Sequence, residues 1–265
     1  MNHQEILSQL DFERQTVPEP DATLDRTRNV VRAIAKIGSR DSIAYSNFLP
    51  QDAEKTIDAE IEYFSKLQRR FEWKVYSHDQ PSDLLDRLRQ RGFKIGEEEA
   101  LMILELHNLP PVLTAPAPDG IEVRPVVDEK GIDDFIYLES AIWAESLTTR
   151  EFMLFNLSDS LRRDLAFIAY SNEKPIGMAR VSASSQSQFA GLWGGSVLSE
   201  FRGRGVYRAL VSARIRRAKE FDSVRYLRVD ALATSRPILE RYGFSRVAST
   251  WPAVWPPERG VKCER

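Results

Sequence analysis

The stretch Val197–Leu210, VLSEFRGRGVYRAL, decides the fold of this chain. An apolar segment passes through Arg202-Gly203-Arg204-Gly205 and continues as a predicted helix from Val206. A strand that turns into a helix through close glycines leaves several backbone N–H groups without partners, and the helix dipole adds positive potential there. Glycine also permits unusual backbone angles and lets a ligand approach the main chain. The stretch therefore predicts a site for phosphate or pyrophosphate.

Several loop types bind phosphate, and the residues of this stretch separate them. A P-loop ends in Gly-Lys-Ser/Thr, whereas this loop continues as Gly205-Val206-Tyr207. A dinucleotide fingerprint needs a third glycine where this chain has Arg208. An ordinary basic strand-to-helix turn and an arginine–glycine contact to nucleic acid are two further interpretations. The pattern Arg/Gln-x-x-Gly-x-Gly/Ala fits Arg202 to Tyr207 except at its last position. That pattern resembles the acetyl-CoA loop of the GCN5-related N-acetyltransferases, the GNAT family.

Composition limits the class of protein. The chain has 265 residues, 42% of them hydrophobic and 29% charged, which is typical of a globular protein long enough for two domains. A net charge of −2 favours neither nucleic acid nor membrane as a partner. The single Cys263 excludes an internal disulfide, and three scattered histidines have no metal-ligand spacing. No apolar run suits a membrane span, and the start lacks a signal-peptide core, so we expect a cytoplasmic protein without a metal.

The hydrophobic pattern of the second half predicts an ordered series of strands and helices. It gives a strand at 121–126, helices at 131–143 and 148–161, strands at 165–170, 175–182 and 189–198, the glycine loop, a helix at 206–219, a strand at 224–231, a helix at 235–242 and final strands. The last helix closes with Gly243-Phe244. This order and closure resemble the GNAT fold over residues 121–255. The resemblance implies an α/β (α+β) fold with a mixed central sheet flanked by helices.

The first half shows a similar order of predicted strands and helices, with fewer matching features. After a helix near the start and another at 27–37, it alternates a strand at 41–49, a helix at 52–70, a strand at 71–76, a helix from Pro81 to Gly92 and strands at 93–106. Its segment DLLDRLRQRGFKI resembles LERYGFSRV of the second half. Only Pro50-Gln51-Asp52, however, occupies the position where a phosphate loop would be. We interpret it as a degenerate copy; the alternative is an unrelated α/β domain.

These patterns define a domain organisation. We expect a degenerate domain at 1–109, a proline-rich linker at 110–119 and an acetyl-CoA-binding domain at 120–265. The sequence gives no oligomeric state.

The resemblance implies direct transfer of an acetyl group from acetyl-CoA to an amine of a small molecule or protein. In this family the strand before the loop splays from its neighbour, so that free backbone groups bind pantetheine and polarise the thioester carbonyl. The cofactor-binding residues implied here are Ser196, Val197, Leu198, Arg202, Gly203, Arg204, Gly205, Val206, Tyr207, Arg208 and Ser235. The amine must arrive neutral, which requires a base or a water chain, and an acid should protonate the leaving thiolate.

The chain departs from the family pattern at the acid. The usual tyrosine, four residues before the closing glycine, is Leu239 here, and the usual asparagine is Leu232. Tyr242, one turn away, is a candidate acid, although core packing is the alternative; Ser235 is a similar candidate. A thiolate can also leave without a dedicated acid.

Candidates for the base and the acceptor pocket lie on both sides of the loop. Glu139, Glu145 and Asp230 are the candidate bases, with a solvated face as the alternative for the glutamates and an ion pair with Arg236 for Asp230. Trp143 and Trp193 are candidate acceptor-binding residues. Trp251 and Trp255 belong either to the pocket mouth or to packing between the halves.

Two rival functions stay open beside the acetyltransferase. A non-catalytic acyl-CoA-binding or regulatory module would keep the loop and lose the acid. Nucleic-acid binding would use the arginines between 204 and 217. Of these, Arg214, Arg216 and Arg217 are expected to face solvent on the 206–219 helix.

Overall fold

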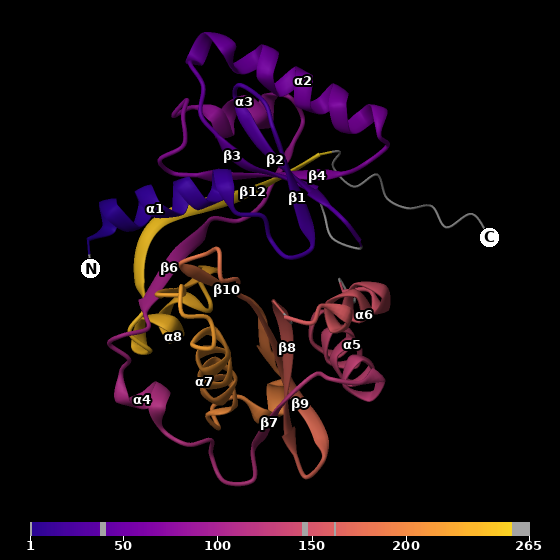
Figure 1. Ribbon diagram of the computed structural model, residues 1–265, viewed down its shortest axis with the longest axis vertical. Helices are drawn as coiled ribbons and strands as arrows, with labels where there is room; N and C mark the ends of the chain where they lie inside the picture. The colour runs from indigo at the N-terminus through magenta and orange to yellow at the C-terminus, as the bar shows by residue number, and fades with distance from the viewer. Residues whose placement is uncertain (1, 38–40, 145–147, 162, 256–265) are drawn as a thin grey trace, which may run out of the picture.

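The computed structural model describes residues 2–37, 41–144, 148–161 and 163–255, and Glu145 lies outside these ranges. Among the described residues the strands form one mixed sheet of twelve (Figure 1). Its order is β1-β2-β3-β4-β12-β6-β11-β10-β9-β8-β7, with β5 beside β12. The sheet therefore runs through both halves of the chain without interruption.

The first half supplies six strands and most of the upper part of Figure 1. Its elements are α1 (His3–Thr16), β1 (Ala22–Arg26), β2 (Val30–Ala35), β3 (Asp41–Ser46), η1 (Pro50–Asp52), α2 (Ala53–Lys66), β4 (Phe71–Tyr76), α3 (Leu84–Gln90), β5 (Lys94–Ile95) and β6 (Glu99–Glu105).

The second half supplies the other six strands. Its elements are α4 (Pro111–Thr114), β7 (Glu122–Pro125), α5 (Glu129–Trp143), α6 (Arg150–Ser158), β8 (Asp164–Ser171), β9 (Lys174–Ser182), β10 (Phe189–Val197), η2 (Ser199–Phe201), α7 (Val206–Ala218), β11 (Tyr226–Ala231), α8 (Arg236–Arg241) and β12 (Ser245–Trp255).

The two halves repeat one motif. In each, a parallel strand pair is joined by a helix, as β3-α2-β4 and as β10-α7-β11. The next helix then closes on a glycine with positive φ, Gly92 at +91° and Gly243 at +84°. The following phenylalanine donates its N–H to a buried leucine carbonyl at 3.1 Å in both cases, Phe93 to Leu88 and Phe244 to Leu239. The degenerate-copy interpretation of the first half rests on these matching hydrogen bonds.

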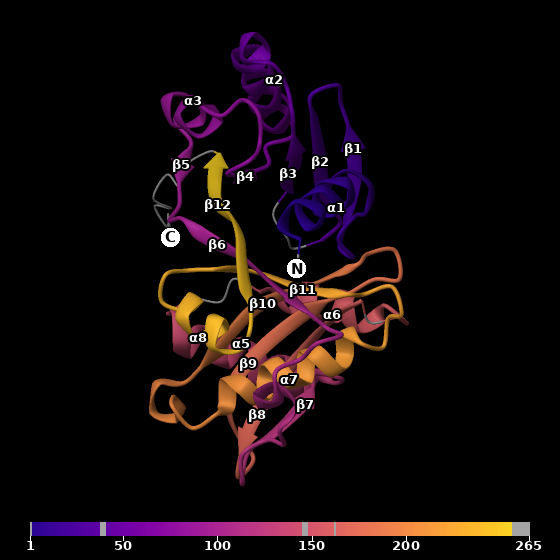
Figure 2. The same cartoon turned by 90° about the vertical axis from the view of Figure 1, so that its left-hand side faces the viewer.

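The halves exchange their last strands. Strand β6 follows α3 but pairs with β11 along its whole length, and β12 follows α8 but pairs with β4. Figures 1 and 2 show purple β6 running into the orange half while yellow β12 runs up into the purple half. Met102 and Leu104 of β6 consequently belong to the core beneath α7, and Ala253 of β12 belongs to the core beneath α2.

Helix α1 crosses the junction of the halves. Its buried residues Ile6 and Leu10 pack on Leu101, Ile103 and neighbouring side chains of the central strands. Helices α7 and α8 lie on the opposite face of the sheet, where their apolar residues join the core that contains β11 residues Leu227 and Ala231.

The sequence predictions for β3, α2, β4, α5, β8, β9 and β10 are confirmed within a few residues. The predicted helix at 27–37 is wrong, because Val30 to Ala35 form strand β2 between β1 and β3. The β-branched pair Val30-Val31 favours a strand there. The predicted solvent-facing position of Arg214 is also wrong, since only 1% of this residue is exposed.

The predicted linker at 110–119 is packed against α7. Leu113 is buried, and its carbonyl accepts a hydrogen bond of 2.8 Å from the Ser212 hydroxyl. The Arg208 guanidinium donates to the carbonyls of Ala115 and Pro116 at 2.9 and 2.7 Å. The domain boundaries at 109 and 120 stay a prediction. Nowhere in the described parts of the chain is there a helix with the length and apolarity of a membrane span.

Candidate active site

The parallel strands β10 and β11 separate after a short paired segment. Pairing covers Phe189–Gly191 with Tyr226–Arg228, after which the two strands diverge. Strand β10 then bulges at Gly194 and Gly195, between its pairs with Arg180 and Met178 of β9. The split between β10 and β11 is the gap that the sequence comparison with acetyltransferases led us to expect.

One backbone amide at this split points away from β9. The Leu198 N–H donates to the Ile176 carbonyl of β9 at 2.9 Å. Hydrogen bonding alternates along an antiparallel pair, so Ser196 also faces β9, whereas Val197 turns its N–H and C=O toward the split. The Arg202 guanidinium confirms this direction because its Nε donates to the Val197 carbonyl at 3.1 Å.

The loop between β10 and α7 has the backbone shape of an anion site. Gly203 and Gly205 have φ values of +75° and +78°, a region that side chains disfavour. The helix that follows begins at Val206, so the amides of its first turn lack intrahelical partners. A side chain at Gly203 would meet no atom within 4 Å, whereas one at Gly205 would lie 2.8 Å from Pro118. The Gly203 side of the loop is therefore open to a ligand.

The loop arginines differ in what they can offer. The Arg208 guanidinium donates to the carbonyls of the 110–119 segment, which turns this side chain away from the role of a free cation at the loop. Arg204 stacks on the Phe201 ring at 5.2 Å. With Arg208 engaged and Arg214 buried, the basic face required for nucleic-acid binding is much reduced.

Two tyrosines meet beside the split on the face of α7. The Tyr207 and Tyr242 rings stack with centroids 6.3 Å apart and an interplanar angle of 18°. Tyr207 also lies close to Gly195, whose added Cβ would be 3.0 Å from its ring. Burial and the neighbouring Tyr207 raise the pKa of Tyr242. Leu239, in the place of the usual acid, is fully buried in the core.

A cavity of about 230 Å³ lies on the opposite face of the sheet. Trp193 and Asp230 line it from β10 and β11, next to the split, and Lys74 and Tyr76 line it from β4. Helix α1, the segment after it, strands β1 to β3 and the residues at the end of β9 form the rest of its wall. The Trp193 indole donates to the Ser182 hydroxyl at 2.9 Å, and Arg228 lies over its ring at 5.6 Å.

Asp230 is held by residues from two other strands, β4 and β12. Its Oδ2 lies 3.1 Å from the Lys74 ammonium, and its Oδ1 accepts a hydrogen bond from Thr250 at 3.2 Å. Lys74 also pairs with Glu99. Burial lowers the pKa of Lys74, but Asp230 and Glu99 outweigh it and hold that pKa above its usual range. Burial and Asp230 raise the pKa of Tyr76. Arg236, the partner weighed for Asp230 from the sequence, pairs with Glu240 instead.

The other candidates occupy separate positions. Glu139 of α5 is buried, and its two oxygens accept hydrogen bonds from the Thr148 N–H and hydroxyl at 2.9 and 2.7 Å. Trp143, at the end of α5, would lie 3.5 Å from a Cβ on Gly194 and so borders the bulge. Ser235 precedes α8, and its hydroxyl donates to the Leu232 carbonyl at 3.2 Å. Trp255 packs on Phe93, 5.3 Å between centroids, which places it between the halves.

Sequence reasoning missed the residues that the first half contributes. Lys74 and Tyr76 alternate along β4 with the core residues Trp73 and Val75, and Arg228 and Asp230 alternate in the same way along β11. Charged residues on one face of an otherwise buried strand could have indicated that this face borders a polar cavity. The pairing of these two faces across the cavity depends on the exchanged strands and has no local signature.

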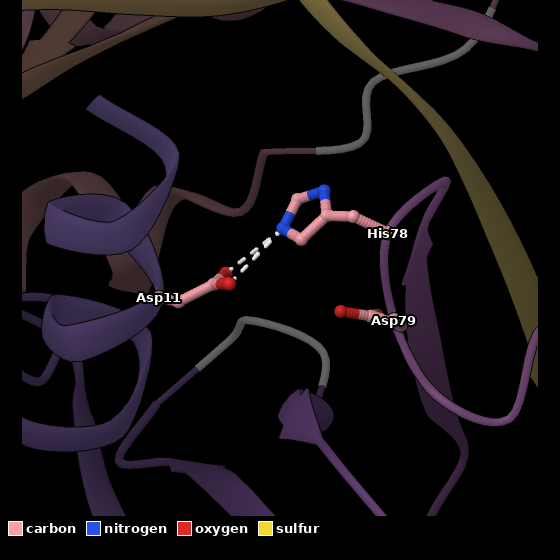
Figure 3. A group of neighbouring side chains, drawn as sticks. All are labelled: Asp11, His78 and Asp79. Carbon is pink, nitrogen blue, oxygen red and sulfur yellow. Dashed lines mark hydrogen bonds and ion pairs between the residues drawn. The ribbon is translucent and has the colours of Figure 1, made fainter. Parts of the chain in front are cut away.

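Two aspartates and a histidine lie together between α1 and the turn that follows β4 (Figure 3). The ligand atoms of Asp11, His78 and Asp79 lie within 4.8 Å of one another. The Arg14 guanidinium, however, donates to Asp79 at 2.9 and 3.0 Å and to Asp11 at 2.8 Å. A cation already balances these carboxylates, so the arrangement suits a clamp rather than a metal site.

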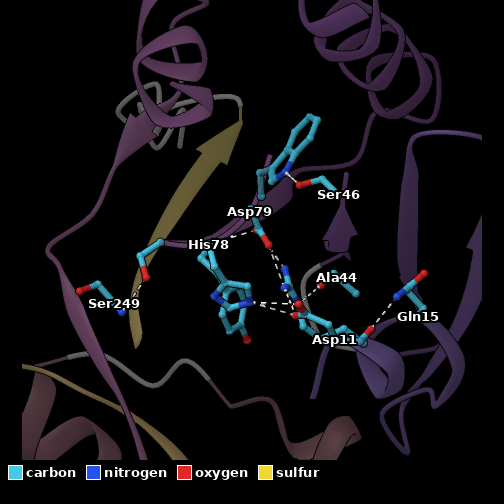
Figure 4. A network of polar contacts seen from close by, with 11 residues as sticks. Asp11, Gln15, Ala44, Ser46, His78, Asp79 and Ser249 are labelled. Carbon is cyan, nitrogen blue, oxygen red and sulfur yellow. Dashed lines mark hydrogen bonds and ion pairs between the residues drawn. The ribbon is translucent and has the colours of Figure 1, made fainter. Parts of the chain in front are cut away.

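The clamp fixes α1 against β3 and β4 (Figure 4). Arg14 also donates to the Ala44 carbonyl at 2.8 Å, and Asp79 accepts from the Tyr76 N–H at 3.0 Å. Burial lowers the pKa of Arg14, but Asp79 outweighs it and raises that pKa overall. Burial opposes ionisation of Asp11, yet His78 and Arg14 hold its pKa below the usual value.

Comparison with known proteins finds a family model that matches part of the second half of the chain. The model of the acetyltransferase (GNAT) family matches residues 132–244. A GCN5-related N-acetyltransferase from Kribbella flavida is 14% identical, with 97% of this chain and 96% of that chain covered and a TM-score of 0.69. A tandem GNAT protein from the clavulanic acid biosynthesis pathway is 14% identical, with coverages of 95% and 94% and a TM-score of 0.61.

A third similar structure is a GCN5-related N-acetyltransferase from Sphaerobacter thermophilus, 16% identical, with coverages of 95% and 91% and a TM-score of 0.57. No curated protein matches the sequence. At these identities the structures establish the tandem fold over the whole chain.

Proposed function

We propose that this chain transfers an acyl group from a CoA thioester to a small amine. The proposal starts from the match of residues 132–244 to the acetyltransferase (GNAT) family model and from the tandem fold that the whole chain shares with solved structures. The observation that carries the proposal is the split between β10 and β11. The glycine loop lies at one side of it, and the cavity with Trp193 and Asp230 lies at the other.

The residues at the split fit a CoA thioester. The open side of the loop at Gly203 and the first amides of α7 suit the pyrophosphate. The Val197 N–H points into the gap, where it can donate to a carbonyl oxygen. When bound, acyl-CoA supplies the acyl group as a thioester. Acetyl-CoA is the thioester that the family resemblance implies.

The cavity provides the acceptor side of the proposed reaction. Asp230 lines the cavity from β11, one of the two strands that form the split, and we assign it the binding of the acceptor ammonium and the removal of its proton. Lys74 and Thr250 fix its orientation. A cavity of about 230 Å³ walled by α1 suits a small amine better than a lysine on a folded protein surface. Glu139 is less suitable as the base because it is buried against Thr148 and does not line this cavity.

The second candidate is a non-catalytic acyl-CoA-binding module. It is favoured by Leu239, which is buried where the family often has a tyrosine acid, and by the stacked Tyr207 and Tyr242. The Tyr242 hydroxyl stays the candidate acid in the proposed enzyme. The alternative within the same mechanism is that the CoA thiolate leaves without being protonated by a dedicated acid.

Turnover separates the two candidates. The full chain would be incubated with acetyl-CoA and a panel of small primary amines, with thiol release and product mass as readouts. The proposal predicts thiol release that depends on one class of amine, and a product heavier by one acyl group. Binding of CoA without release against any amine would favour the non-catalytic module.

A further inference from the structure

One arginine of α7 is buried and has no counter-ion in the part of the chain that the structure describes. Arg214 is only 1% exposed, although it belongs to the helix that follows the glycine loop. Its Nε donates to the Leu210 carbonyl of the same helix at 3.2 Å, and its guanidinium also interacts with the Tyr207 hydroxyl. Its Nη2 has no hydrogen-bond partner among the described residues. Burial lowers the pKa of Arg214, which shows the cost of keeping it charged there.

Two other enclosed arginines, the buried Arg14 and the half-buried Arg228, have carboxylate partners. Arg14 pairs with Asp79 and Asp11, and Arg228 pairs with Glu19. Within the described residues, no carboxylate forms an ion pair with Arg214. A charge buried without a partner is costly, and replacing it with an apolar side chain is often stabilising. Packing alone therefore does not account for an arginine at this position.

The guanidinium lies beside the split. A Cβ added to Gly195 would be 3.1 Å from Nη2 and 3.3 Å from Nη1, so the bare backbone of the β10 bulge faces the charge. Gly195 precedes Ser196 and Val197, the residues at which β10 has left β11. The unpartnered donor is thus next to the gap in which the proposed thioester is held, on the face of α7.

We propose that Arg214 binds the free carboxylate of a dicarboxylic acyl group, so that the site prefers the CoA thioester of a short dicarboxylic acid over acetyl-CoA; this inference rests on the proposed function. A carboxylate is the planar, bidentate partner that a guanidinium selects, and in this setting it also neutralises the buried charge. A neutral acetyl group offers no such partner.

Binding of CoA species to the full chain tests the inference without any need for turnover. The probes are free CoA, acetyl-CoA, malonyl-CoA and succinyl-CoA, measured by calorimetry with wild type, Arg214→Met and the control Arg216→Met, which changes an exposed arginine of the same helix. Wild type and the control should bind malonyl-CoA or succinyl-CoA at least tenfold more tightly than acetyl-CoA. Arg214→Met should lose that preference while its affinity for free CoA stays within about twofold.

Thermal unfolding without ligand supplies a second readout. Arg214→Met should unfold at or above the wild-type temperature, because an unpaired buried charge is removed. If Arg214 had only a structural role, Arg214→Met would instead unfold at a lower temperature than wild type and would keep the same preference among the CoA thioesters. Equal affinity of wild type for all three thioesters, or equal weakening of free CoA and of the dicarboxylic thioesters in Arg214→Met, would overturn the inference and leave the proposed function standing. Failure of every CoA species to bind wild type would overturn both.

Discussion

The Lys74 ammonium of β4 lies 3.1 Å from the Asp230 carboxylate of β11, so the first half of the chain supplies a direct partner to the candidate active site of the second. Thr250, on the exchanged strand β12, donates to the other carboxylate oxygen. The first half, although it lacks a glycine loop, therefore takes part in the chemistry that we propose.

Replacement of Asp230 with asparagine tests its role as the acceptor-binding base. The amide keeps the size of the side chain and the Thr250 contact, but it cannot take a proton. We expect kcat for the amine to fall by roughly 10²-fold or more, with CoA affinity unchanged because the loop is not altered. Steady-state kinetics and CoA titration measure the two effects. A variant with wild-type kcat would exclude Asp230 from proton transfer.

The Arg14–Asp79 clamp predicts a large loss of stability when it is broken. Asp79→Asn leaves the buried Arg14 without its main counter-ion, which we expect to cost about 3–5 kcal/mol of unfolding free energy. Asp86→Asn is the matched control, because the Asp86–Arg89 pair is exposed and worth less than about 1 kcal/mol. Chemical denaturation measures both variants. Similar losses in the two would show that the clamp is not specific.

Asp164 predicts a pH dependence of stability. Burial raises its pKa to about 6, from an ordinary value of 3.8, despite Arg180 nearby. The folded state therefore keeps a proton that the unfolded state loses, and stability falls as the pH rises from about 4 to about 6. The full difference is about 3 kcal/mol.

Asp164→Asn should remove this fall and raise the unfolding free energy at pH 7 relative to wild type. Denaturation between pH 4 and pH 8 checks the prediction. The two proteins should converge near pH 4, and parallel curves over the whole range would show that Asp164 does not titrate in this window.

The exchanged strands predict that the second half does not fold by itself. A chain of residues 110–265 lacks β6, which leaves β11 unpaired on one side and removes Met102 and Leu104 from the core. We expect this fragment to show no cooperative unfolding transition by circular dichroism. Addition of the fragment 1–109, which carries β6, should restore the transition. A cooperative transition in 110–265 alone would contradict the interlocked arrangement.

Local patterns were enough to predict most of the fold. The two glycines of the loop, the alternation along β4 and the Gly-Phe closures each act within a few residues of the chain. The segment 27–37 was predicted wrongly because its apolar spacing also suits a helix, and pairing with β1 and β3 decided the outcome.

The site was harder to predict for a different reason. Arg214 was placed in solvent because charge usually indicates exposure, whereas its place in the helix turns it into the core. The cavity is lined by α1, β1 to β4 and the ends of β9 to β11, and the exchanged strands β6 and β12 lie between β4 and β11 in the sheet.

Calorimetric titration of free CoA and acetyl-CoA into the full chain tests the central claim most directly. Gly203→Val is the informative variant, since a side chain there meets no protein atom but changes the open side of the loop. Gly120→Val is the matched control, because Gly120 has a similar φ of +73° and equal free space in another turn. We predict one binding event per chain in wild type and in the control, and none in Gly203→Val. Absence of binding in wild type, or unchanged affinity in Gly203→Val, would contradict the account.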